Sequence, residues 1–98
     1  MNSDSPLPGK DIPCFEFDAD HPGGDYENFD SMIPDNCLEA CIADPICLGF
    51  TWTSELFLAN PNKCFLKSSI TPVEFQEGSV SAVLVNCGIP RDGPPAKI

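Results

Sequence analysis

Residues 34–53, PDNCLEACIADPICLGFTWT, contain the pattern that decides the fold. Pro34 suits the first turn of a helix, where its missing amide hydrogen is not needed, and Asp35 suits the positive N-terminal end. Apolar residues then recur along one helix face, at Cys37, Leu38, Cys41 and Ile42. Asp44 precedes a proline and therefore avoids the helical conformation. The stretch predicts a helix over residues 34–43.

The segment after this helix alternates large apolar residues with small ones, Leu48, Phe50 and Trp52 against Gly49, Thr51 and Thr53. A period of two with aromatic and β-branched residues predicts a strand. Residues 64–67 are its expected hairpin partner, across a loop over residues 54–63.

Shorter strands are expected over residues 14–17 and 26–29, with a loop over 18–25 between them. The run Val80, Val83, Leu84 and Val85 predicts a final strand. The predicted class is α+β, with one helix packed on a small antiparallel sheet.

Six cysteines lie between positions 14 and 87, which we expect to bound the domain. A chain of 98 residues buries too little apolar surface to be stable without some cross-link. Zinc sites normally show paired Cys-x-x-Cys or Cys/His spacings, and this sequence has none. The sole histidine, His21, lies apart in a Gly/Pro-rich stretch. We therefore expect three disulfides, no metal or cofactor, and an oxidising compartment outside the cytosol.

A net charge of −10 makes nucleic acids and anionic membranes poor partners. No apolar run is long enough to span a membrane, and the start of the chain does not resemble a signal peptide. We expect a monomeric module cut from a longer protein, with Met1 added for expression. Proline, glycine and charged residues predict linkers over residues 1–13 and 88–98.

The order of these features resembles the PAN/apple family. The matching motifs are the helical Cys37-x-x-x-Cys41, the third cysteine Cys47 followed by Gly-Phe-Thr-Trp, and Cys64-Phe-Leu-Lys-Ser-Ser. The residues alone permit 15 disulfide connectivities among six cysteines. The resemblance implies pairing of Cys37 with Cys64 and of Cys41 with Cys47. It also implies the additional apple-type bridge between Cys14 and Cys87.

The resemblance implies an interaction module rather than an enzyme. Similar modules occur in plasma proteases, growth factors, oomycete lectin-like proteins and the microneme adhesins of apicomplexan parasites. We expect a secreted or cell-surface module that binds a protein or carbohydrate partner, of the microneme adhesin kind used in host-cell attachment. A structural spacer in a tandem array and a regulatory apple domain of a secreted protease are the alternatives. A disulfide between the two ends of the domain places the entry of the chain beside its exit, which suits tandem repeats. Weak binding sites in such repeats gain overall affinity through avidity.

Two loops carry the candidate contact residues. In the loop over 54–62 these are Leu56, Phe57, Leu58 and Asn60, an apolar run in an exposed connection; it either contacts a partner or folds back on the core. In the acidic segment over 18–28 they are Asp20, Asp25 and Tyr26. The acids of that segment invite a calcium interpretation, but Pro22 and Phe29 occupy the fifth and twelfth places of the EF-hand pattern.

Trp52 has two interpretations, a core residue that shares a strand face with Phe50 or a platform for a sugar ring. No catalytic constellation is recognisable, because a Ser/His/Asp or Cys/His site would have to use His21 and cysteines expected to be oxidised. No pair among the fifteen acids is singled out by its spacing either.

Overall fold

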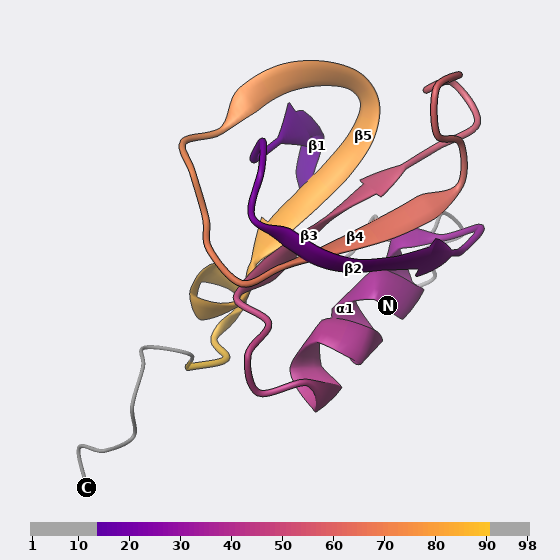
Figure 1. Cartoon of the computed structure of the whole chain (residues 1–98). Coiled ribbons are helices and arrows are strands. Elements are labelled where there is room, and N and C mark those ends of the chain that lie inside the picture. Colours follow the sequence, from indigo (N-terminus) through magenta and orange to yellow (C-terminus); the bar gives the residue numbers. More distant parts are fainter. Residues whose placement is uncertain (1–13, 91–98) are drawn as a thin grey trace, which may run out of the picture.

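The computed structural model describes residues 14–90 as five strands, one α-helix and a short 3-10 helix. In chain order these are β1 (Glu16–Asp20), β2 (Asp25–Asp30), α1 (Pro34–Ala43), β3 (Gly49–Thr53), β4 (Lys63–Lys67), β5 (Glu74–Val83) and η1 (Leu84–Cys87). The α+β architecture predicted from the sequence is confirmed: α1 lies against one side of a single curved sheet (Figure 1).

The sheet has the order β1-β5-β3-β4-β2, and all its pairings are antiparallel. β3 is the middle strand; its Phe50 and Trp52 face the helix, while Thr51 and Thr53 face the opposite side. β5 is the longest strand, and Figure 1 shows its first half bending over the sheet on the side away from α1. The bend encloses a concave polar surface opposite the helix.

The core lies between α1 and the sheet. It contains Phe15, Phe50, Leu66, Val80, Ala82, Leu84 and the four cysteines of two disulfides. Cys37–Cys64 joins the helix to β4, and Cys41–Cys47 joins the helix to the segment before β3. All four of these cysteines are fully buried, so the bridges replace part of the apolar volume that a domain of this size lacks.

A third bridge, Cys14–Cys87, joins a residue two positions before β1 to the end of η1. The three bridges are the ones that the PAN/apple resemblance implies. Their sequence separations are 73, 27 and 6 residues. In the chain-entropy model the stabilisation grows with loop length, so Cys14–Cys87 contributes the largest and Cys41–Cys47 the smallest share.

The expected loop over residues 18–25 is partly wrong, because β1 continues to Asp20. Antiparallel pairing with β5, including Ala19 opposite Phe75, outweighs the low β-propensity of this segment. Asp18 adopts a φ of 56° at an irregularity in that pairing, and its carboxylate accepts a hydrogen bond from the Gly78 amide.

The expected final strand is also misplaced. β5 begins at Glu74, well before the predicted valine run, and ends at Val83. Leu84–Cys87 forms a 3-10 turn in place of a strand, and Gly88 follows with a φ of 82°. The left-handed Gly88 lets its amide return to the carbonyl groups of the turn, which ends the element.

Candidate functional site

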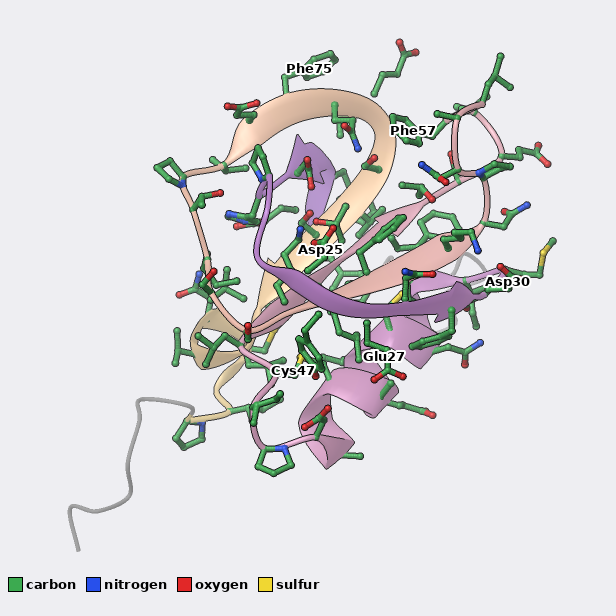
Figure 2. The ribbon with its side chains drawn as sticks, in the orientation of Figure 1. Asp25, Glu27, Asp30, Cys47, Phe57 and Phe75 are labelled. Carbon is green, nitrogen blue, oxygen red and sulfur yellow. A yellow bond between two sulfur atoms is a disulfide. The ribbon has the colours of Figure 1, made fainter. Side chains whose placement is uncertain are left out.

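The concave side of the sheet contains a small polar cavity of about 180 Å³, which we call the Lys67 pocket. Its polar lining consists of Asp20, Asp25, Thr51, Thr53, Asn60, Lys67 and Gln76, with Gly23 at its edge. Phe57 and Phe65 supply its aromatic walls. In Figure 2, Asp25 lies beneath the bend of β5, and Phe57 lies beside that bend, next to the loop between β3 and β4.

Lys67 lies at the base of this pocket and is only 2 % exposed. Its Nζ donates to Asp25 Oδ1 at 2.5 Å and to the Gly23 carbonyl at 2.9 Å. The Asp20 carboxylate lies 4.0 Å away, outside hydrogen-bonding range. Burying an ammonium group is tolerated only when it is paired, and these two carboxylates supply the opposing charge.

Register explains why these groups meet. Asp25 of β2 lies directly opposite Lys67 of β4, and Phe65 lies opposite Thr51 of β3. Residues two apart on a strand share a face, so Lys67 and Phe65 face the same side as Thr51 and Thr53. Side chains alternate between the two faces of β3. Phe50 is therefore buried beneath the helix, and both threonines line the pocket.

The threonines belong to a hydrogen-bond network along the pocket wall. The Thr51 hydroxyl donates to Asp20 Oδ1 at 2.9 Å and lies 2.7 Å from the Ser81 hydroxyl. Ser81 donates to the Ala19 carbonyl at 2.8 Å, which continues the network to β1. This network orients the Asp20 carboxylate beside the ammonium group of Lys67.

The loop between β3 and β4 closes one side of the pocket. The Thr53 hydroxyl donates to the Asn60 carbonyl, which draws the loop against the sheet. Phe57 is half-buried in the pocket wall, whereas Leu56 and Leu58 are 66 % and 85 % exposed. The apolar run therefore divides, with its central residue turned inward and its flanking residues turned to solvent.

The structure brings four of the seven sequence-predicted contact residues, Asp20, Asp25, Phe57 and Asn60, into one pocket. Leu56 and Leu58 lie outside its lining. Tyr26 lies elsewhere, packed against the core, with its hydroxyl donating to Asp44 Oδ2 at 2.6 Å. The other lining residues, Lys67, Thr51, Thr53, Phe65 and Gln76, are not among the seven sequence-predicted contact residues. The alternation of β3 could have indicated the two threonines, because they point away from the helix.

Two other residues considered from the sequence have structural contacts. Trp52 packs against the core, and its indole N–H donates to the Ser31 carbonyl at 2.9 Å. His21 is buried, with Nδ1 2.6 Å from the Thr71 carbonyl and Nε2 2.7 Å from Glu16 Oε1. Both ring nitrogens of His21 thus tie the Thr71 segment to β1.

With these features in place, comparison with known families gives a direct match. The PAN domain model matches residues 19–67, half of the chain, from the end of β1 through α1 to the end of β4. The chain belongs to the PAN domain family. The match contains the four cysteines that connect α1 to its surroundings, together with Lys67, Asp20 and Asp25. No curated protein matches the chain.

PAN domains are interaction modules of extracellular proteins, where they mediate protein or carbohydrate binding, and they are generally non-catalytic. Three disulfides in this PAN domain are consistent with a secreted or cell-surface location. Its single α-helix among residues 14–90 is too short to cross a membrane.

Proposed function

We propose that this PAN domain, over residues 14–87, is an adhesion module of a larger secreted or cell-surface protein, and that the Lys67 pocket binds a carbohydrate. The observation that carries the proposal is the buried ammonium group of Lys67. An ammonium group has three N–H donors. Among residues 14–90, Gly23 and Asp25 accept two of them, which leaves one N–H to donate to a ligand hydroxyl group.

The chemistry of the pocket suits a sugar ring. Carboxylate oxygens of Asp20 and Asp25 can accept hydrogen bonds from sugar hydroxyl groups, and the amides of Asn60 and Gln76 can do both. The rings of Phe57 and Phe65 offer apolar faces to the C–H groups of a sugar. The volume of about 180 Å³ is below the range for drug-sized ligands, so it suits one monosaccharide unit.

We extend the proposal to attachment of the parent protein to glycans of a host cell, as in an apicomplexan microneme adhesin. A site for one sugar unit binds weakly on its own, because few contacts offset the entropy of association. Several linked modules raise the effective concentration and hence the overall affinity. Adhesion through repeated modules is therefore compatible with a shallow site.

Screening the isolated protein on a glycan array, followed by NMR titration with the best monosaccharide, tests the proposal. The expected result is saturable binding with shifts at Lys67 and Phe65. Phe57→Ala should weaken it about tenfold or more, because a ring face is lost. Leu58→Ala is the matched control in the same loop and should bind as the unmodified protein does. Absence of any sugar binding, or full binding by folded Phe57→Ala, would contradict the proposal.

A protein partner is the second candidate function, and the exposure of Leu56 and Leu58 favours it. Large apolar side chains this exposed often mark contact surfaces. In this case Leu58→Ala should abolish capture of a defined extracellular partner, while Phe57→Ala should have the smaller effect. If neither glycans nor proteins bind, the spacer alternative is favoured.

A further inference from the structure

The helix side of the sheet has a second hollow, which differs in chemistry from the Lys67 pocket. We call it the Trp52 groove; its apolar lining is Phe17, Met32, Pro34, Trp52 and Val80, and its volume is about 310 Å³. It lies where α1 begins and leaves part of β1 and β5 uncovered. Phe17, Val80 and Trp52 are neighbours across three adjacent strands, so the floor is one continuous row.

The groove exposes more apolar surface than the fold requires. Phe17 is 57 % exposed and Met32 is 71 % exposed. Both side chains border the same hollow, although a single domain gains nothing by keeping two large apolar groups in water. Methionine adapts its shape readily and is enriched at protein interfaces, which suits a rim that closes on a partner.

Met32 also borders a neighbouring hollow that includes Asp30, Asn36 and Asn62. The two hollows therefore meet at one flexible side chain. Together they form a surface that is apolar at Trp52 and mixed beyond Met32, where Ile33 and Pro61 lie beside Asp30, Asn36 and Asn62. A surface of this shape fits an extended chain segment that places one apolar side chain in the groove and continues across Met32.

The charge of the domain surface indicates which kind of partner segment can bind in the groove. Residues 14–90 contain twelve Asp and Glu residues and two lysines, Lys63 and Lys67. Each of these lysines is already paired with a carboxylate, Lys63 with Asp30 and Lys67 with Asp25. The surface therefore presents negative charge with little positive charge to offset it, and a cationic partner is attracted over about a Debye length.

The acidic groups are close to the groove itself. Asp18 is exposed and belongs to the lining. Glu55 and Glu77 are exposed and adjoin the lining residues Ser54 and Gly78. A second copy of the same chain would bring like charges together, so charge argues against self-association and for a basic segment.

We propose that the Trp52 groove is a second binding site, for an extended segment of a partner protein in which a large apolar residue is flanked by Arg or Lys. The apolar side chain packs against Trp52 and Val80 between Phe17 and Met32. The flanking cations lie near the acidic groups beside the groove, Asp18, Glu55 and Glu77. Because Trp52 and Thr51 point to opposite faces of β3, this site and the Lys67 pocket can be occupied together.

Trp52 is the only tryptophan in the chain, so its fluorescence reports on this groove directly. The probes are three synthetic heptapeptides: a central leucine with an arginine two residues away on each side, the same peptide with glycine for leucine, and the same peptide with glutamate for both arginines. The first should shift Trp52 emission to shorter wavelength in a saturable manner. Each of the others should bind at least about tenfold more weakly.

Variants locate the site. Phe17→Ser and Met32→Ser should each weaken binding of the arginine peptide about fivefold or more, while Val73→Ser, of similar exposure but outside the groove, should leave it unchanged. Met32 is in a loop, so its variant tests the site even if Phe17→Ser disturbs β1. All variants should retain sugar binding in the Lys67 pocket, so this proposal and the proposed function fail separately.

Three outcomes would overturn the proposal. The glycine peptide could bind as well as the leucine peptide, which would indicate general charge attraction. The glutamate peptide could bind as well as the arginine peptide, which would remove the charge argument. Trp52 emission could change with protein concentration alone, with a dimer in sedimentation, which would identify a second copy of the chain as the occupant.

Discussion

The two faces of β3 are held in different ways, although they belong to the same five residues. On the helix face, Phe50 and Trp52 lie beside the fully buried Cys37–Cys64 bridge. On the opposite face, Thr51 and Thr53 lie in a polar network completed by Lys67 and two aspartates. The first face is held by a covalent bond and apolar packing, and the second by hydrogen bonds and charge. In this small domain, one face of β3 thus contributes mainly to stability, and the other presents the polar groups of the candidate binding site.

Among changes to the two faces of β3, the largest expected effect comes from removing the covalent link on the helix face. Cys37→Ala with Cys64→Ala opens a loop of 27 residues and should lower the free energy of unfolding by about 3–4 kcal/mol. Cys41→Ala with Cys47→Ala opens a loop of 6 residues and should cost about 2 kcal/mol. Urea denaturation measures both. An equal cost for the two pairs would show that loop length does not control the stability of this face.

The next effect comes from the charge on the opposite face. Lys67→Met leaves Asp20 and Asp25 without their buried counter-ion and should destabilise the fold by about 2–3 kcal/mol. Lys63→Met removes the exposed pair with Asp30 and is the matched control, with an expected cost below about 0.5 kcal/mol. Thermal and urea denaturation of both variants provide the comparison. If both cost the same, burial of Lys67 is not what makes the polar face sensitive.

The smallest effect concerns the hydroxyl network. Thr51→Val keeps the shape of the side chain but removes the hydroxyl that contacts Asp20 and Ser81. The expected cost is about 1–2 kcal/mol, because buried polar partners lose a hydrogen bond. Amide exchange at β1 and β3 should rise in this variant. Unchanged stability and exchange would mean that the network is not needed to hold the polar face.

The helix face was largely predictable from the sequence, and the concave face was not. Pro34, the spacing of Cys37 and Cys41, and the proline after Asp44 are local signals, and they gave the helix its bounds. Phe50 and Trp52 indicated β3 in the same way. Local propensity, hydrophobic period and chain-terminating residues all agree in this part of the chain.

The concave face depends on long-range pairing, which local patterns do not encode. The local sequence predicts a loop at Asp20, and this residue becomes part of β1 only because β5 pairs beside it. The sequence predicts Lys67 at the end of a hairpin strand, and no local signal indicates its burial, because lysine is rarely buried. Its burial follows from its register opposite Asp25, which is 42 positions away in the sequence. The sequence could therefore indicate individual candidate residues. Their assembly into one pocket could be seen only in the folded structure.

The Cys14–Cys87 bridge has a mechanical consequence. Its Cα atoms are 5.0 Å apart, so the polypeptide enters and leaves the folded unit at nearly one point. When the flanking segments are pulled in opposite directions, tension passes through one covalent link and bypasses the strand pairings. The strand pairings on both sides of β3 should therefore persist under a pulling force that would separate the strands of a sheet without this bridge.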